Sequence, residues 1–345
     1  MRSESDNHKN LLCTPEEIWR ILHANATSLK QSVDIAGIAT REKSLLDEQM
    51  KIFLRSAPAG KFERSTYGDV RSFFDEACKD YDSDLENPYW SFTHEILKFI
   101  LRKFIVEHFS ETQEIRLFDA GAGTGNWSAW VLRMNPRTCG TLFDMNANML
   151  KVAYAKIIRL HGNATRIVEG DLEVTSDFPS ERSNLILCMH NVIGLGRNTE
   201  RILRNLFLHL EEGGLAFIMA MNKYHAFNFT RRFRDETEAL RVLGDGSVKF
   251  KSDMPEMFCY TPNELHAVLM SAGFNEVTVL GFPVTAYPSP QDTKLLQKET
   301  LDQQLTNAYN RAMLLKVEKR LCLYPELAYR GGSSLIAICK KNADQ

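Results

Sequence analysis

Residues 115–128 read IRLFDAGAGTGNWS, and this stretch decides the fold. Its first four residues form a short, mostly apolar run of the kind that becomes a buried parallel strand. Asp119 ends the run, Gly121, Gly123 and Gly125 follow at alternate positions, and a helical pattern comes next. The stretch predicts a strand, a glycine-rich turn and a helix, in which bare backbone approaches a ligand at the helix N-terminus.

The spacing of the acid and the glycines favours one class of ligand. The order is D-x-G-x-G-x-G, whereas the dinucleotide fingerprint is G-x-G-x-x-G with an acid only on the next strand. An acid at the tip of the first strand repels a pyrophosphate but attracts a cationic amino-acid group. The stretch therefore predicts a site for S-adenosylmethionine (SAM), which becomes S-adenosylhomocysteine (SAH) after reaction, and not for a dinucleotide.

Composition excludes several other classes. The chain has 345 residues, 44% hydrophobic and 25% charged, which is ordinary for a soluble globular protein. Its net charge is -2 and no basic arm is present, so we expect no nucleic-acid partner. Seven scattered cysteines without a C-x-x-C pair favour a reducing compartment. The start of the chain lacks the apolar core of a signal peptide, and no run is long enough for a membrane helix. We expect a cytoplasmic protein without a membrane partner.

Apolar runs and helical patterns alternate after the glycine-rich turn, which predicts an α/β fold with a doubly wound sheet. Strands are expected at residues 115–119, 140–144, 165–169, 184–189, 215–220, 276–281 and 334–339. Right-handed crossovers place the loops after the parallel strands on one edge of the sheet, where ligands bind.

The remaining segments suggest additions to this core. Residues 1–68 are expected to form an N-terminal helical extension, which serves packing, a homodimer contact or a wall of the substrate pocket. Residues 69–345 form the main domain. Two inserts, at about 221–260 and 282–332, are expected to cover the substrate, and the second carries one long helix at about 292–321.

Four further motifs support a resemblance to the class I (Rossmann-like) SAM-dependent methyltransferases of the small-molecule type. The glycine-rich stretch resembles motif I of this family. The four other segments that resemble family patterns are FDEACKDYD at 74–82, DMNANML at 144–150, LEEGGLAFI at 210–218 and YTPNELHAVLMSAGF at 260–274. Two positions depart from the pattern, because Asn146 replaces a serine and Glu212 replaces a proline. The resemblance covers about residues 70–281 and 333–341. It implies a seven-stranded, mostly parallel sheet whose last strand is antiparallel.

The same resemblance, together with the strand positions, indicates the cofactor site. Asp144 lies about 20–25 residues beyond the glycines, the distance expected of an acid that accepts hydrogen bonds from ribose hydroxyls. By resemblance, Asp171 receives the adenine amino group, the backbone N–H of Leu172 reaches the ring, and the segment with Tyr81 closes over the cofactor. The predicted cofactor-binding residues are Asp119, Gly121, Gly123, Gly125, Asp144, Met145, Asp171, Leu172, His190 and Tyr81.

Candidates for the chemistry lie near the ends of the later strands. His190 directly follows the expected strand 184–189, and an imidazole can take a proton near neutral pH, so it is either a general base or a residue that backs the cofactor. We expect His94, on a helix, to pack. The candidates for substrate contact are Tyr89, Trp90, Asn191, Tyr224 and His225. No close pair of acids with a histidine follows this strand, so we expect no metal.

The sequence therefore predicts an enzyme that transfers a methyl group from SAM to an N, O or C atom of a small metabolite. The helical extension and the two inserts suggest an enclosed pocket, which suits a small molecule. The alternatives are a methyltransferase that acts on RNA or protein, and an inactive partner protein that keeps the fold.

Overall fold

The computed structural model describes residues 67–161, 165–286, 301–329 and 332–342. All of them lie in one structural unit, Ala57–Gln345. The helices expected between residues 14 and 60 lie outside the described residues. None of the described helices combines the length and the apolar character that a membrane span requires.

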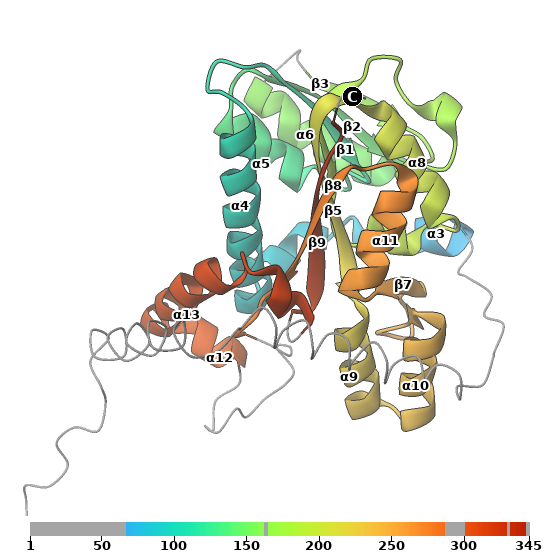
Figure 1. Cartoon of the computed structure of the whole chain (residues 1–345), viewed down its shortest axis with the longest axis vertical. Helices are drawn as coiled ribbons and strands as arrows, with labels where there is room; N and C mark the ends of the chain where they lie inside the picture. Colours follow the sequence, from blue (N-terminus) through green and yellow to red (C-terminus); the bar gives the residue numbers. More distant parts are fainter. Residues whose placement is uncertain (1–66, 162–164, 287–300, 330–331, 343–345) are drawn as a thin grey trace, which may run out of the picture. The chain divides into compact units, whose positions relative to one another are not determined.

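A mixed sheet forms the centre of the fold (Figure 1). Its main strands are β1 (Ile115–Ala120), β2 (Thr138–Asp144), β3 (Thr165–Glu169), β4 (Ser183–Cys188), β5 (Leu210–Asn222), β8 (Glu276–Phe282) and β9 (Ser334–Lys340). The order is β3-β2-β1-β4-β5-β9-β8, in which β9 is antiparallel to both of its neighbours and the pairs from β3 to β5 are parallel. The predicted seven-stranded sheet with an antiparallel last strand is confirmed.

Helices cover both faces of this sheet because its central strands are apolar on both sides. Leu185 and Leu187 of β4 pack with α4 (Pro88–His108) and α5 (Asn126–Met134). Ile186 and Cys188 face the other way, towards α8 (Thr199–His209) and α11 (Pro262–Ala272). A smaller cluster joins α5, α6 (Ala147–His161) and β2. Because helices cover both faces of the sheet, the carboxyl ends of its parallel strands are the place left for a ligand.

Local sequence signals start and stop these helices. Thr261 and Glu264 form a capping box at the start of α11, and Gly273 ends the helix with a φ of 117°. The Asn87 side chain accepts from the backbone N–H groups of Tyr89 and Trp90, so α4 begins at Pro88. This start places Tyr89 and Trp90 on a helix.

Two elements differ from the predictions. β5 begins at Leu210, because the segment LEEGG continues the strand through an irregular register beside Ser183 and Gly213 takes a φ of 73°. The long helix expected at about 292–321 is described from residue 301, as α12 (Leu301–Thr306) and α13 (Ala308–Leu321). Asn307 separates them because its side chain caps the start of α13.

The insert after β5 folds into a small subassembly of its own. It contains α9 (Lys223–Phe233), α10 (Glu236–Asp245), β6 (Ser247–Val248) and β7 (Met257–Tyr260). β7 pairs in parallel with the end of β5, and β6 pairs with β7. This arrangement adds two short strands to the sheet beside the last two residues of β5.

Candidate active site

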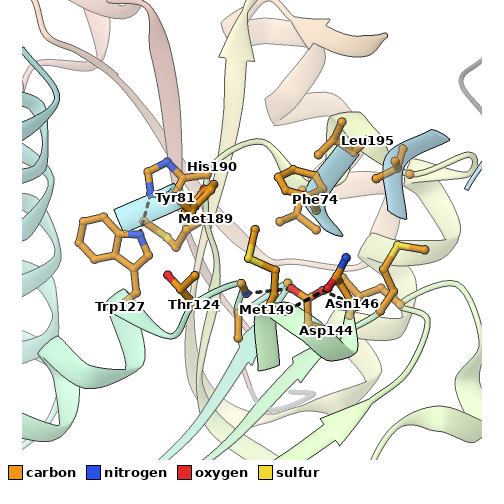
Figure 2. Close-up of a pocket in the computed structure, with 18 of the residues that line it drawn as sticks. Phe74, Tyr81, Thr124, Trp127, Asp144, Asn146, Met149, Met189, His190 and Leu195 are labelled. Atoms are coloured by element: carbon orange, nitrogen blue, oxygen red, sulfur yellow. Dashed lines mark hydrogen bonds between the residues drawn. The ribbon is translucent and has the colours of Figure 1, made fainter. Parts of the chain in front are cut away.

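A cavity lies at the carboxyl edge of the sheet, where the strand order predicted a ligand site (Figure 2). Its walls come from the segments that follow β1, β2, β3 and β4, together with α3 (Tyr67–Ala77), the short helix η1 (Tyr81–Glu86) and the start of α4. The predicted residues on its wall are Tyr81, Trp90, Gly121, Gly123, Asp144, Met145, Asp171, Leu172 and His190. The described part of the two inserts contributes no lining residue, so their expected role as substrate cover is not seen there.

The glycine-rich turn takes the backbone conformation that only glycine adopts without strain. Gly121, Gly123 and Gly125 have φ values of 73°, 54° and 75°. A Cβ on Gly121 would lie 2.5 Å from the Val192 side chain, and one on Gly125 would lie 3.0 Å from Ala153. Gly121 and Gly123 line the cavity, whereas Gly125 lets the turn pack against α6.

Asp144 is fixed in place by the glycine turn and by its own loop. Its Oδ2 accepts from the Gly123 backbone N–H at 2.8 Å, and its Oδ1 accepts from the Asn146 backbone N–H at 2.8 Å. Burial raises the pKa of Asp144, and these backbone hydrogen bonds oppose that rise. The carboxylate therefore stands at the cavity wall in a defined orientation (Figure 2).

Asp119 lies behind the wall and not on it. The residue is 1% exposed, and its carboxylate accepts from the Ser128 hydroxyl at 2.6 Å. Burial raises its pKa to about 6, although the hydrogen bonds from Ser128 oppose the rise. A desolvated carboxylate needs a partner, and the first turn of α5 supplies one. Asp119 thus connects the end of β1 to the first turn of α5, on either side of the glycine turn.

The helices α3 and η1, here called the lid, are tied to the cavity rim by polar contacts. Arg71 donates to the Met145 carbonyl at 2.5 Å and to Glu169 at 2.8 Å. Asn146 donates to Asp75 at 3.1 Å. These contacts place Tyr81 of the lid on the wall of the cavity.

A second set of lid contacts centres on Asp82. Its carboxylate accepts from Thr124 at 2.7 Å, from Asn126 at 2.8 Å and from Lys156 at 2.8 Å. Burial alone would raise the pKa of Asp82, but these three donors outweigh it and hold the pKa below its usual value. The lid is therefore fastened to the glycine turn, α5 and α6.

Away from Asp144, the cavity wall consists mainly of aromatic and imidazole side chains. Trp90, His94, Trp127 and His190 line it beside Met189. Trp127 Nε1–H donates to His190 Nε2 at 2.9 Å (Figure 2). The His94 ring centroid lies 4.9 Å from that of Trp127 and 5.1 Å from that of His190. Sequence reasoning assigned His94 to packing and did not single out Trp127; the i, i+4 spacing of Trp90 and His94 was the signal for a shared face.

Both histidines of this ring cluster are neutral near pH 7. Burial lowers the pKa of His190 to about 4. Burial, with the charges of His190 and Lys98, lowers the pKa of His94 to about 3. Since Nε2 of neutral His190 accepts from Trp127, the hydrogen-bond pattern assigns the ring proton to Nδ1. The Nε2 lone pair of His190, which would have to take a proton, is therefore already engaged by the Trp127 N–H.

Four predicted substrate residues do not line the cavity. Tyr89 is buried, and its hydroxyl lies 3.2 Å from the Ser333 hydroxyl. Asn191, with a φ of 62°, bridges strands, because its side chain accepts from the Met221 N–H and donates to the Phe258 carbonyl. The two others, on α9, are Tyr224 and His225.

These positions have a common cause. The helix that starts at Pro88 turns Tyr89 into the core and leaves Trp90, which is 42% exposed, at the cavity. The first turns of α9 belong to the small subassembly after β5, in which the ring of His225 lies near those of Phe229 and Phe250. A residue's position shortly after a strand in the sequence does not show which way its side chain points once a helix begins there.

Comparisons with known proteins agree with this geometry. The family described as "Methyltransferase domain" matches residues 117–214, which include the glycine turn, Asp144 and Asp171. No curated protein matches the chain by sequence.

Solved structures of low identity are similar to the chain. One is a putative methyltransferase in complex with the Haloferax volcanii Trm112 methyltransferase activator, at 14% identity and a TM-score of 0.49, covering 80% of this chain and 99% of that one. Another, from Thermotoga maritima, is described as a possible histamine N-methyltransferase, at 16% identity and a TM-score of 0.47, covering 79% and 99%.

A third is the plantazolicin methyltransferase BamL in complex with a triazolic desmethylPZN analogue and SAH, at 14% identity and a TM-score of 0.44, covering 79% of this chain and 98% of that one. The sheet order, the glycine turn and the family match agree on one assignment. The family match assigns residues 117–214 to a methyltransferase domain, and the chain has the sheet order and the glycine turn of the class I, Rossmann-like SAM-dependent methyltransferases.

Proposed function

We propose that this methyltransferase acts on a small molecule bound at the ring-lined end of the cavity, next to the methyl group of SAM. One observation carries the proposal: a single cavity, covered by the lid, runs from Asp144 and Asp171 to Trp90, His94 and Trp127. A cofactor at the first end leaves the second end for the acceptor. The aromatic walls suit a compact, largely apolar acceptor.

The charge of the cavity wall supports a small acceptor over RNA. Arg71 is the one lysine or arginine among the described lining residues, and it is occupied by the Met145 carbonyl and Glu169. A nucleic-acid site needs a cluster of basic side chains to meet phosphates. The described cavity lacks such a cluster.

In this arrangement each wall has a separate task. Asp144 accepts from the ribose hydroxyls, Asp171 and the Leu172 backbone meet the adenine, and the turn at Gly121 and Gly123 leaves room for the amino-acid part. The sulfonium then presents its methyl group to the acceptor. The protein aligns the nucleophile with the carbon–sulfur bond and excludes water, and the lid serves that exclusion.

The test uses SAM that carries a trideuteriomethyl group. The protein is incubated with this SAM and either the small-molecule or the macromolecular fraction of a cell extract, and mass spectrometry follows the deuterium. We expect deuterium in a small molecule, and less of it in that molecule when Asp144→Asn protein is used at a SAM concentration that does not saturate the variant. Label only in RNA or protein would replace the proposal with the macromolecular alternative. Binding of SAM without any labelled product would favour the inactive partner.

A further inference from the structure

His94 differs from His190, the other histidine of the cavity, because its ring nitrogens make no hydrogen bond to a described residue. Its recorded contacts are the ring contacts with Trp127 and His190. Neither nitrogen is among the described buried polar atoms without a partner, so both keep accessible surface. The side chain lines the cavity. A neutral imidazole in this position offers a lone pair to a bound molecule.

His190, by contrast, is committed to Trp127. Its Nε2 accepts the indole N–H at 2.9 Å, so its Nδ1 carries the proton. To act as a base, His190 would have to give up this hydrogen bond or change its tautomer. The ring is therefore equipped to donate a hydrogen bond and not to accept a proton.

We propose that His94 is the general base that takes the proton of the acceptor during methyl transfer, in place of His190. The inference rests on the proposed function and narrows the acceptor to a protic group, such as a hydroxyl, a thiol or an acidic C–H. The acceptor atom attacks the methyl carbon, and the electron pair of the carbon–sulfur bond stays on sulfur, which gives SAH. The acceptor's proton passes to a ring nitrogen of His94, which becomes imidazolium.

The charge balance of the cavity makes this step feasible despite the low pKa of His94. Near pH 7, where His190 is neutral, an imidazolium at His94 is penalised by burial and by the charge of Lys98. During the reaction, however, the positive charge of the sulfonium disappears as the imidazolium forms, so the net charge of the cavity stays the same. The indole of Trp127, whose ring centroid lies 4.9 Å away, can then stabilise the new cation.

The ring environment also sets the pH dependence. The groups that face His94 are Trp127 from α5, His190 from the end of β4 and Lys98 from its own helix. With a pKa of about 3, His94 stays neutral across the physiological range. The rate should therefore show no loss from protonation of this base between pH 6 and 8.

Labelling with diethyl pyrocarbonate tests the access and the protonation of His94 before any acceptor is known. The reagent acylates an unprotonated imidazole nitrogen, and mass spectrometry locates the product. We expect label on His94 at similar rates at pH 6 and pH 8, whereas N-acetylhistidine in the same tube slows at pH 6 because its ordinary pKa is about 6.5. SAH should slow the labelling of His94 and not that of His266, which is exposed on α11.

Turnover tests the role itself, with trideuteriomethyl SAM and the small-molecule fraction as the probe. His94→Ala should lower product formation by about 100- to 10,000-fold while SAH affinity stays unchanged, and imidazole in the buffer should restore part of the rate. His266→Ala is the matched control and should keep the wild-type rate.

Two results would overturn the inference: no label on His94 in the free protein, or full turnover by His94→Ala. If the wild type yields no labelled small molecule, the proposed function fails instead. The diethyl pyrocarbonate result then still decides whether His94 is an open, neutral ring at the cofactor cavity.

Discussion

Burial keeps several histidines of this domain uncharged. His209 is 6% exposed, lies against the rings of Phe118 and Phe178, and has its Nε2 3.4 Å from the Ser183 hydroxyl. Burial, with the charge of Arg182, lowers its pKa to about 4. The unfolded chain, with an ordinary pKa of about 6.5, binds a proton that the folded chain refuses. The stabilising effect of neutral His209 is therefore complete above pH 6.5 and is lost as the pH falls towards 4.

The resulting prediction concerns the free energy of unfolding at two pH values. Between pH 7 and pH 5, His209 should account for a loss of about 2 kcal/mol. Urea unfolding should therefore show a smaller drop over this range for His209→Gln than for the wild type. His266→Gln, at an exposed site, should keep the wild-type drop. Equal drops in the wild type and His209→Gln would mean that His209 titrates normally in the folded protein.

At the scale of elements, the lid is held by a few polar contacts at the rim of the cavity. Asp82 of η1 bonds to Thr124, Asn126 and Lys156, and Arg71 of α3 bonds to the Met145 carbonyl and Glu169. Segments held mainly by such contacts open more easily than the core, and a ligand that touches them favours the closed form. The lid should therefore respond to the cofactor.

Hydrogen exchange with mass spectrometry measures this response. SAH should slow exchange of the amides of α3 and η1, while those of α11, which contributes no residue to the cavity wall, stay unchanged. Asp82→Ala should speed exchange of the lid in the free protein because it removes three hydrogen bonds. Equal exchange of α3 and η1 with and without SAH would show that they do not act as a lid.

Elements with strong local signals were predictable from the sequence. The strand and glycine turn at 115–125 and the capping box of α11 follow from residues a few positions apart, and the structure has both. The start of β5 at Leu210 and the break at Asn307 were missed. The first depends on pairing with a distant strand, and the second on a cap inside an otherwise helical pattern.

The candidate site was predictable at the level of backbone position but not of side-chain partners. Asp144 and Asp171 were expected from their place after strands, and both line the cavity. Our proposal that His94 and not His190 is the general base depends on the Trp127–His190 hydrogen bond, which joins residues 63 positions apart. Such a contact exists only after the sheet has brought α4, α5 and β4 together.

At the scale of the whole molecule, the order of the strands creates the site. β1 and β4 are neighbours, and the chain runs from β1 to β2 on one side and from β4 to β5 on the other, so the loops after β1 and β4 diverge to open a crevice. The glycine turn, Asp144 and His190 come from three such loops and meet at one cavity. The central claim is that SAM occupies this cavity with Asp144 as the ribose contact.

Calorimetric titration of SAH into the wild type and Asp144→Asn tests this claim most directly. We expect binding to the wild type, and a dissociation constant raised roughly ten- to a hundredfold in the variant, because a hydrogen bond to a charged group contributes about 1.5–3 kcal/mol. Asp253→Asn, at an exposed site, should bind SAH like the wild type. Wild-type affinity in Asp144→Asn, or no binding of SAH to any of the three proteins, would contradict the account.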